Sequence, residues 1–416
     1  MTFDSVVVVG GGLAALRCCE ALRRSGLRGP VRVIADEKVA PYDRPPLSKE
    51  LLRGEWEPDR IALRGDSLAP SSLDDLDLDL RLGVRATSLR VAGSAGTGGT
   101  VELDDGSSIE GDAVVLATGA SARPLPGAPD LDGLHMLRTL DDALAIRADL
   151  AARDRLVVVG GGFIGAEVAA SAHTLGLQVT ILEALPVPLS RVLGDEMGTA
   201  LAALHADHGV EVQTSVRVDG FVGDGRVSGV EITRPDMSTE VVPAGVVVIG
   251  IGAVPNTSWL EGSGLTIDDG VRCDDALRAA PGVWAVGDVA RWPNPLFGEE
   301  MRVEHWTNAV ESALHVAAAV TAGPDTPPVP FAPVPYVWSD QYDDRIVHVG
   351  RNRADDRVVV LHGSIDERRF VAGYEREGRL VAALSLNDPR RLMRYRRLLA
   401  DGSSWDDALA LAAELA

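Results

Sequence analysis

The feature that most constrains the fold is a strand–helix–strand unit that occurs twice, with the copies about 150 residues apart. Each copy has an apolar strand, a glycine-rich turn, a helix and a second apolar strand, in the first copy at Val6–Val9, 10–12, Leu13–Arg24 and Val31–Ala35. The second copy has these parts at 156–159, at 160–162, in a helix that ends near Leu175, and at Gln178–Leu182. Short, all-apolar strands are typical of a parallel sheet buried on both faces. The duplication predicts an α/β protein with two Rossmann-like dinucleotide-binding domains.

The first glycine turn has the spacing of a phosphate-binding loop, and its candidate contacts are Gly10, Gly12, Leu13, Ala14 and Ala15. The first glycine permits a tight turn, the second lets the backbone approach a pyrophosphate, and the small third residue lets the helix pack close to the strand. The helix N-terminus stabilises the phosphate charge. Asp36 or Glu37, directly after the second strand, can accept the hydroxyls of an adenosine ribose. The alternative is a glycine-rich turn that binds nothing.

The second turn has the complete spacing, and its candidate contacts are Gly160, Gly162, Phe163, Ile164 and Gly165. Glu183 follows the second strand of this copy, where a carboxylate binds a free 2′-hydroxyl and repels a 2′-phosphate. No arginine directly follows Glu183, and the nearest downstream is Arg191, which either contacts a phosphate or is simply solvated. We therefore expect two dinucleotides, FAD in the first unit and NADH, rather than NADPH, in the second.

Charge and cysteine content exclude several classes of function. Forty basic and 61 acidic side chains give a net charge of −21, whereas nucleic acids and anionic membranes require a broad positive surface. No apolar run approaches the 18 residues that suggest a membrane span. The three cysteines, Cys18, Cys19 and Cys273, have no CxxC spacing and cannot hold a four-cysteine iron–sulfur cluster, so we expect no metal site. We expect a cytoplasmic protein.

Further strands indicate how the domains are organised. Strands expected at 113–117, 246–249 and 283–286 each run into a glycine-containing turn, as strands do when they deliver backbone to a ligand. A proline-rich stretch at 321–335 is the expected linker to a C-terminal α+β module. In that module we expect strands at 346–349, 358–361, 370–374 and 380–383, and helices at 389–399 and 405–415. The predicted division is an FAD-binding domain (1–110 and 243–322), an NAD-binding domain (111–242) and a C-terminal domain (323–416).

Two later segments, Val114-Val-Leu-Ala-Thr-Gly119 and Val283-Trp-Ala-Val-Gly-Asp288, resemble the remaining FAD motifs of the two-dinucleotide flavoprotein reductases. The resemblance narrows at Pro41-Tyr-Asp-Arg-Pro-Pro-Leu-Ser-Lys49, Leu137-Arg-Thr-Leu-Asp-Asp142, Gly160-Gly-Gly-Phe-Ile-Gly-Ala-Glu167, Glu304-His-Trp-Thr-Asn308 and Trp338-Ser-Asp-Gln341. Together these are similar to the oxygenase-coupled NADH:ferredoxin reductases, a family that includes the reductases of aromatic-ring dioxygenases, putidaredoxin reductase and the rubredoxin reductases. The implied fold is a glutathione-reductase-like pair of nucleotide domains followed by an α+β domain.

The resemblance also implies roles for single residues. Asp288 would accept a hydrogen bond from the ribityl chain of FAD, with a helix N-cap as its alternative role. Arg44 and Arg138 match positions that contact FAD. Trp306 and Trp338 match aromatic positions near the isoalloxazine ring, with plain core tryptophans as the alternative. The remaining candidate cofactor-binding residues are Ala86, Thr118, Gly119, Gly252, Gly287, Glu304 and His305.

Lys49 and Glu167 are the candidate catalytic residues. Lys49 is one of only two lysines among the 40 basic residues, which indicates a position that arginine does not serve. A cation near the flavin N5–O4 edge stabilises negative charge on reduced flavin, and the resemblance implies Glu167 as its partner and as a neighbour of the nicotinamide. The alternatives are an ordinary lysine and a carboxylate on a helix surface.

The segment 42–49 contains no cysteine, where disulfide reductases of this fold carry a CxxxxC pair and NADH peroxidases and oxidases carry one catalytic cysteine. Cys18 and Cys19 lie in the first helix, where they are expected to fill the core. Without a thiol nucleophile, dithiol exchange is excluded and the flavin itself must pass electrons on.

The leading hypothesis is a ferredoxin–NAD⁺ reductase. NADH delivers a hydride to FAD, and two single electrons then pass to a separate [2Fe–2S] ferredoxin that serves a cytochrome P450 or a Rieske oxygenase. A rubredoxin is the alternative partner. From another class, an NADH-responsive flavoprotein resembling apoptosis-inducing factor remains open, whereas an NADH oxidase is disfavoured by the missing cysteine.

An acidic ferredoxin needs a local basic patch on so acidic a reductase. The densest basic segment contains Arg390, Arg391, Arg394, Arg396 and Arg397. If the segment is helical, Arg390, Arg394 and Arg397 lie on one face, and we expect this face to dock the ferredoxin. The alternative is that these arginines solvate a terminal helix or pair with the chain's own acids.

Overall fold

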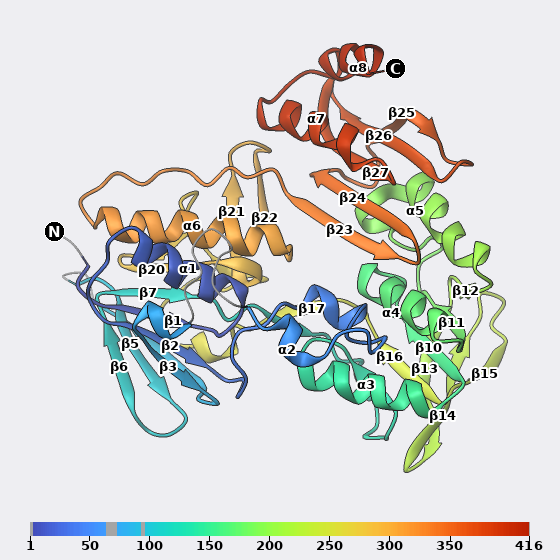
Figure 1. The fold of residues 1–416 in the computed structure, drawn as a ribbon, viewed down its shortest axis with the longest axis horizontal. Coiled ribbons are helices and arrows are strands. Elements are labelled where there is room, and N and C mark those ends of the chain that lie inside the picture. Colours follow the sequence, from blue (N-terminus) through green and yellow to red (C-terminus); the bar gives the residue numbers. More distant parts are fainter. Residues whose placement is uncertain (1–2, 64–72, 93–95, 416) are drawn as a thin grey trace. The chain divides into compact units, whose positions relative to one another are not determined.

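The structure is a computed structural model that describes residues 3–63, 73–92 and 96–415 (Figure 1). The chain folds into two compact units. Unit 1 comprises Met1–Asp43, Ala62–Ser121 and Val254–Val337, and unit 2 comprises Arg44–Ile61, Ala122–Ala253 and Trp338–Ala416. No helix in the described part of the chain combines the length and the apolar character needed to cross a membrane.

Unit 1 is built on a six-stranded sheet in the order β19-β20-β7-β1-β2-β3. Its strands are β1 (Val6–Val9), β2 (Val31–Ala35), β3 (Leu78–Leu82), β7 (Ala113–Leu116), β19 (Arg278–Ala280) and β20 (Val283–Ala285). All neighbours pair in parallel except β19 and β20. Every residue of β1 and β7 is buried, as expected for a parallel sheet covered on both faces. Helices α1 (Leu13–Arg24) and α6 (Trp306–Ala322) pack against each other.

Two small sheets and three short 3₁₀ helices complete unit 1. One sheet contains β4 (Ala86–Val91), β5 (Gly99–Leu103) and β6 (Ser108–Gly111), and the other β18 (Val271–Arg272), β21 (Ala290–Asn294) and β22 (Glu299–Arg302). The 3₁₀ helices are η2 (Leu73–Leu76), η3 (Ser258–Leu260) and η4 (Gly287–Val289). The chain passes between the units within β8 (Ala120–Ala122) and within β17 (Ala253–Pro255), and also at 43/44, 61/62 and 337/338.

Unit 2 contains a second parallel sheet, in the order β12-β11-β10-β16-β9. Its strands are β9 (Leu134–Met136), β10 (Arg155–Val159), β11 (Gln178–Leu182), β12 (Glu211–Gln213) and β16 (Val246–Ile249). Its helices are α2 (Pro58–Ile61), α3 (Leu140–Ala152), α4 (Phe163–Thr174) and α5 (Ser190–Asp207), with the 3₁₀ helix η1 at Pro45–Ser48. An antiparallel sheet of β13 (Arg217–Asp224), β14 (Arg226–Thr233) and β15 (Thr239–Pro243) follows β12 in the chain.

The C-terminal part of unit 2 is a five-stranded sheet with two helices, drawn in orange and red in Figure 1. The sheet has the order β23-β24-β27-β26-β25, with β23 at Tyr336–Gln341, β24 at Asp344–Gly350, β25 at Arg357–Ser364, β26 at Arg369–Arg376 and β27 at Arg379–Leu386. The helices are α7 (Pro389–Ala400) and α8 (Trp405–Glu414). Apolar side chains of α5, including Met197 and Leu201, share one core with Phe370 and Tyr374 of β26. This shared core joins the C-terminal sheet to the part of unit 2 that contains the parallel sheet.

The predicted architecture of two duplicated nucleotide-binding sheets and a C-terminal α+β module is confirmed. Four C-terminal strands and two helices lie where they were expected, but β23 was not predicted. The predicted linker also begins too early, because α6 continues to Ala322. Thr321 and Ala322, the first residues of the predicted linker, still belong to the helix. The helix ends at its C-cap, Gly323, whose backbone φ is +87°.

The units divide the chain at residues other than the predicted domain boundaries. Strand β7 lies in the predicted 111–242 domain but pairs with β1 in unit 1. Strand β16 lies in the predicted 243–322 segment but pairs with β10 in unit 2. Both predicted boundaries therefore come one strand too early, because each sheet is completed by a strand that returns to it after a long insertion. A further segment, 44–61, belongs to unit 2.

Candidate functional site

The first glycine of each turn is pressed against the backbone of a neighbouring strand end. Gly10 has φ +131°, and a Cβ on it would lie 2.1 Å from the carbonyl oxygen of Ala117. Gly160 has φ +106°, and a Cβ on it would lie 2.4 Å from the carbonyl oxygen of Gly250. Only glycine fits this backbone conformation at so close an approach. The two copies therefore share one geometry, built from β1 and β7 in unit 1 and from β10 and β16 in unit 2.

The second glycine of each turn faces open space. A Cβ on Gly12 or Gly162 would meet no atom of the described residues within 4 Å. Both glycines are also N-caps, of α1 and α4 respectively, and a glycine has no side chain to cap the first amides of a helix. Free amides at a helix N-terminus with space in front of them suit a phosphate group. The residues present thus fit the pyrophosphate of a dinucleotide in both units.

The third position of the motif sets how closely the helix approaches the turn. A Cβ on Gly165 would lie 2.2 Å from the carbonyl oxygen of Gly160, so α4 leaves no room for a side chain. In unit 1 the same position is Ala15, which is buried. Phe163 is half-buried and Ile164 is 47% exposed in the first turn of α4. Leu13 and Ala14 lie at the start of α1.

The carboxylates that follow the second strands are not equivalent in the two copies. Gly161 donates its N–H to Glu183 Oε2 at 2.7 Å, so this carboxylate lies directly beside the glycine turn. In unit 1 a Cβ on Gly11 would instead meet the Cβ of Ala35, so Ala35 occupies the position of Glu183. Asp36 is one residue further on and exposed, and Glu37 accepts a 2.6 Å hydrogen bond from Tyr42. The register of strand and turn could not be read from the spacing alone.

Two turns at the ends of β7 and β20 lie in unit 1. Thr118 donates its hydroxyl to the backbone oxygen of Asn256, and the Asn256 amide donates back to the Thr118 carbonyl at 2.8 Å. Gly119, with φ +65°, accepts the Asn256 N–H. Asn256 is a residue that our sequence analysis missed.

The Gly287–Asp288 turn lies beside helix α1. A Cβ on Gly287 would approach Ala14 Cβ to 3.2 Å, and the Gly287 N–H donates to Ser312 Oγ at 3.0 Å. Asp288 is inside η4, whose N-cap is Val286, so the alternative role of Asp288 as an N-cap is wrong. The turn thereby brings the first and last motifs of the predicted FAD site together.

The Glu304–Asn308 segment forms the start of α6. His305 is the N-cap, Glu304 is exposed and accepts a hydrogen bond from Arg302, and Trp306 donates its indole N–H to Asp43 Oδ1 at 2.8 Å. Trp306 is only half-buried and is not a core tryptophan. Ala86 begins β4 and is not part of a strand-end turn.

Lys49 and Glu167 meet inside unit 2. The distance from Lys49 Nζ to Glu167 Oε2 is 2.7 Å, and both residues are 6% exposed. Lys49 follows η1, whose Pro45 carbonyl also accepts from Nζ at 3.1 Å, and Glu167 projects from the second turn of α4. Glu167 is therefore not a carboxylate on a helix surface. Within such a buried ion pair, the Lys49 ammonium group is held in place where water screens its charge only weakly.

Serine hydroxyls surround this ion pair. Ser48 donates to Glu167 Oε2 at 2.6 Å, and Ser339 of β23 donates to Glu167 Oε1 at 2.7 Å. Ser171, one helical turn after Glu167, donates to the Ser48 carbonyl at 2.6 Å. The sequence alone suggests no role for these serines, although Ser48 and Ser339 lie inside motifs that carry the family resemblance.

The remaining candidates of unit 2 lie around α3, β16 and the C-terminal sheet. Arg44 donates to the Arg138 carbonyl at 2.5 Å, and Arg138 leads into α3 through a capping box made by Thr139 and Asp142. Other placements are Gly252 (φ +110°) after β16, Arg191, exposed at the start of α5, and Trp338, half-buried in β23.

The three cysteines are expected to be unreactive as nucleophiles because they are buried. All three are buried, and burial raises the pKa of the Cys19 and Cys273 thiols to about 12 and that of Cys18 well above its usual value. Only the thiolate reacts with alkylating reagents. We expect iodoacetamide at about pH 8 to leave the folded protein unmodified and active, and to label all three cysteines after denaturation. Fast labelling of the folded protein with loss of NADH oxidation would contradict a thiol-free mechanism.

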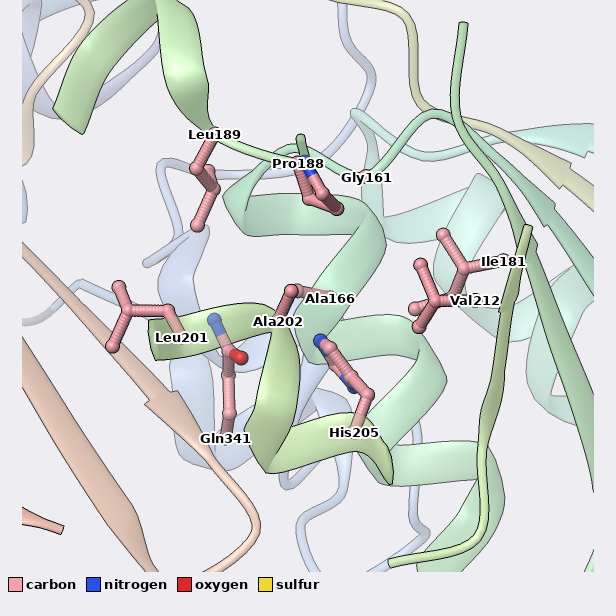
Figure 2. A pocket seen from close by; sticks show the side chains of 10 residues that line it. All are labelled: Gly161, Ala166, Ile181, Pro188, Leu189, Leu201, Ala202, His205, Val212 and Gln341. Atoms are coloured by element: carbon pink, nitrogen blue, oxygen red, sulfur yellow. The ribbon is translucent and has the colours of Figure 1, made fainter. Parts of the chain in front are cut away.

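A small cavity lies behind the second glycine turn, between α4, α5 and the end of β23 (Figure 2). Its lining includes Gly161, Leu189, His205 and Gln341. The free space suits no more than one water molecule, so this cavity is not a nucleotide site. Burial and the neighbouring His208 lower the pKa of His205 to about 4, so its imidazole is neutral at physiological pH.

Comparisons with known proteins agree with this geometry. The sequence profile of the pyridine nucleotide-disulphide oxidoreductase family matches residues 4–313, and the profile described as reductase C-terminal matches residues 336–415. The chain is 37% identical to rhodocoxin reductase of Rhodococcus erythropolis, over 95% of this chain and 89% of that protein. It is 36% identical to the ferredoxin–NAD⁺ reductase component of the anthranilate 1,2-dioxygenase system of Burkholderia cepacia, over 98% and 96% of the two chains.

Among solved structures, the chain is similar to putidaredoxin reductase in its covalent complex with putidaredoxin. The TM-score is 0.86 at 32% identity, covering 97% of this chain and 94% of the other. In each of these comparisons, the alignment covers nearly the whole length of both chains.

Proposed function

Because this chain belongs to the pyridine nucleotide-disulphide oxidoreductase family, and within it to the oxygenase-coupled ferredoxin reductases, we propose that it passes electrons from NADH through FAD to a separate [2Fe–2S] ferredoxin. The ferredoxin in turn feeds a cytochrome P450 or a Rieske oxygenase. We also propose a cytoplasmic location, where NADH is available as the donor.

The observation that carries the proposal is the buried Lys49–Glu167 ion pair in a segment without a cysteine. FAD, when bound, supplies the ability to accept a hydride and to release single electrons. The chain's own part is to hold a cation on Lys49, oriented by Glu167, that stabilises the added negative charge. The glycine turn before α1 would hold the pyrophosphate of FAD, and the glycine turn before α4 would hold the pyrophosphate of NADH.

The preference for NADH over NADPH rests on Glu183. Its two carboxylate oxygens accept the N–H groups of Gly161 and Leu185, both at 2.7 Å, which fixes the carboxylate at the glycine turn. A negative charge fixed there repels a 2′-phosphate and can still accept from a ribose hydroxyl through its remaining lone pairs.

The proposed docking site is the α7 arginine face, which we define as Arg390, Arg394 and Arg397. All three are exposed, and Met393, 43% exposed, lies among them. Arg391 does not belong to this face, because it donates to Asp388 and to the backbone oxygen of Leu415. Arg394 also reaches Glu414 at 3.3 Å, a pair so exposed that it competes weakly with a docking partner.

Reversing the α7 arginine face to glutamate is expected to raise the apparent KM for an acidic [2Fe–2S] ferredoxin at least about tenfold at low salt, since it removes the attraction that guides encounter. The salt dependence of ferredoxin reduction should weaken. NADH-to-ferricyanide activity should stay, because this small acceptor needs no docking surface. Steady-state kinetics at two salt concentrations measure all three effects.

A matched control reverses Arg81, Arg90 and Arg217, which lie on other sheets, and so changes the net charge equally. Arg90 and Arg217 are exposed and Arg81 is half-buried. We expect this control to change the KM little. If the two triple variants behave alike, or if the α7 variant reduces ferredoxin like the parent, docking takes place elsewhere.

The experiment that tests the proposed function starts with the purified protein and its pigment. We expect a yellow protein that releases FAD, not FMN, on denaturation, and whose flavin absorbance is bleached by NADH without oxygen. Adding oxidised [2Fe–2S] ferredoxin should restore the flavin absorbance, and rubredoxin serves as a second acceptor in a parallel reaction. A folded but colourless protein that takes up no FAD would overturn the proposal.

A further inference from the structure

Glu167 is held by three separate donors that come from two distant parts of the sequence. Its Oε2 accepts from Lys49 Nζ at 2.7 Å and from Ser48 Oγ at 2.6 Å, both from the N-terminal segment of unit 2. Its Oε1 accepts from Ser339 Oγ at 2.7 Å. Within the described ranges, Ser339 is the one side chain that donates to Oε1. The C-terminal sheet thus supplies one of the three donors, and it is the donor to Oε1.

The sequence pattern of β23 places Ser339 for this contact. Side chains alternate between the two faces of a strand, so Ser339 and Gln341 share one face and Asp340 lies on the other. Ser339 is 0% and Gln341 1% exposed, while Asp340 reaches Arg345 at 3.4 Å. The inward face of β23 therefore carries two polar side chains, and both are buried.

Gln341 fixes the direction of the Ser339 hydroxyl. Its Nε2 donates to Ser339 Oγ at 3.2 Å, and an amide nitrogen only donates. Because Ser339 accepts from Gln341, its single hydroxyl proton is left for Glu167. Gln341 also lines the small cavity of Figure 2, beside the neutral His205.

We propose that Ser339, oriented by Gln341, is a positioning residue that fixes the Glu167 carboxylate and through it the Lys49 ammonium group. This inference rests on the proposed function for its consequence, since Lys49 stabilises charge on bound flavin. The geometry itself stands without it. The C-terminal sheet then takes part in the reductive chemistry and is not only a docking platform.

The physical reason is the cost of an unpaired oxygen on a buried carboxylate. Without the Ser339 hydroxyl, Oε1 has lost its donor while the carboxylate stays in low dielectric. The carboxylate then rotates or draws in water, and Lys49 loses its fixed position. One charge-assisted hydrogen bond corresponds to about a tenfold change in the population of the ordered pair.

The chain offers an unusually direct readout, because it contains only two lysines. Lys38 is exposed and Lys49 is buried, so competitive acetylation followed by mass spectrometry measures Lys49 against an internal reference. The measurement uses the purified full-length protein and needs neither NADH nor ferredoxin. A failure of the proposed function would therefore leave this test intact.

We expect Ser339→Ala to raise the acetylation of Lys49 relative to Lys38 about tenfold, and Glu167→Gln to raise it at least as much. Ser339→Thr keeps a hydroxyl and should restore the parent ratio. Gln341→Met keeps the volume but loses the amide donor, so it should give a smaller rise, and it replaces Ser339→Ala if that variant does not fold. In FAD-loaded protein, we also expect Ser339→Ala to lower the flavin midpoint potential, in the same direction that we expect for Lys49→Met.

Ser385→Ala is the matched control. Ser385 is a fully buried serine of the same sheet, on β27, and its hydroxyl has no hydrogen-bond partner within the described residues. This control should change neither the acetylation ratio nor the potential. The inference is overturned if Ser339→Ala keeps the parent acetylation ratio, or if Ser385→Ala raises that ratio equally.

Discussion

Replacing Glu167 by alanine is expected to lower the free energy of unfolding by about 3–5 kcal/mol. The reason is that Lys49, 6% exposed, keeps its ammonium group but loses the carboxylate 2.7 Å away. An uncompensated buried charge costs more than the ion pair contributes. Denaturant unfolding of the purified variant measures the loss, and the rate of NADH-dependent ferredoxin reduction should fall with it.

A double variant separates stability from chemistry. Lys49→Met combined with Glu167→Leu replaces the ion pair by apolar side chains of similar size, which is often neutral for stability. We expect the double variant to recover part of the unfolding free energy that Glu167→Ala loses, because the unpaired ammonium group is gone while the Ser48 and Ser339 hydroxyls still lack their acceptor. We also expect it to remain slow in ferredoxin reduction. A double variant that regains both stability and rate would show that the ion pair serves the fold alone.

The second large effect is expected for Glu183→Arg. This substitution should lower the ratio of kcat/KM for NADH to kcat/KM for NADPH about a hundredfold or more. Arginine removes the charge that repels a 2′-phosphate and adds one that attracts it, and each contribution is on the order of 1–3 kcal/mol. Steady-state kinetics with both nucleotides give the ratio directly.

The control for this prediction is Glu183→Gln, because Glu183 also accepts the N–H groups of Gly161 and Leu185. Glutamine keeps one acceptor oxygen and carries no charge. It should shift the preference less than arginine does while leaving the turn largely intact. If neither variant changes the preference, the discrimination between the nucleotides is made by another residue.

The glycine turns were predictable because their information is local. Gly10 and Gly160 are required by a positive φ and by backbone contact with a neighbouring strand, and both requirements act at fixed spacing after an apolar strand. The duplicated sheets follow from these turns. The carboxylate of the first unit was less predictable, because Ala35 occupies the position that Glu183 has in the second unit. The spacing of the motif does not reveal a shift of one residue in register.

The surroundings of Glu167 could not be predicted by pattern alone. Ser48 and Ser339 are 291 residues apart in the chain and meet only because both contact the same carboxylate. Serine is a common residue with no periodicity of its own, and β23 was not recognised as a strand. The family resemblance pointed to the motifs that contain these serines, but only the folded structure gives them a physical role.

The most direct test of the account is an anaerobic titration of the FAD-loaded protein with NADH in the presence of excess oxidised [2Fe–2S] ferredoxin. We expect each NADH to reduce two ferredoxins, because a hydride carries two electrons and the cluster accepts one. In aerated solution without ferredoxin, we expect NADH oxidation to be slow, because oxygen is a poor electron acceptor in place of ferredoxin. NADH oxidation that proceeds equally fast with oxygen alone, with no ferredoxin reduced, would contradict the account.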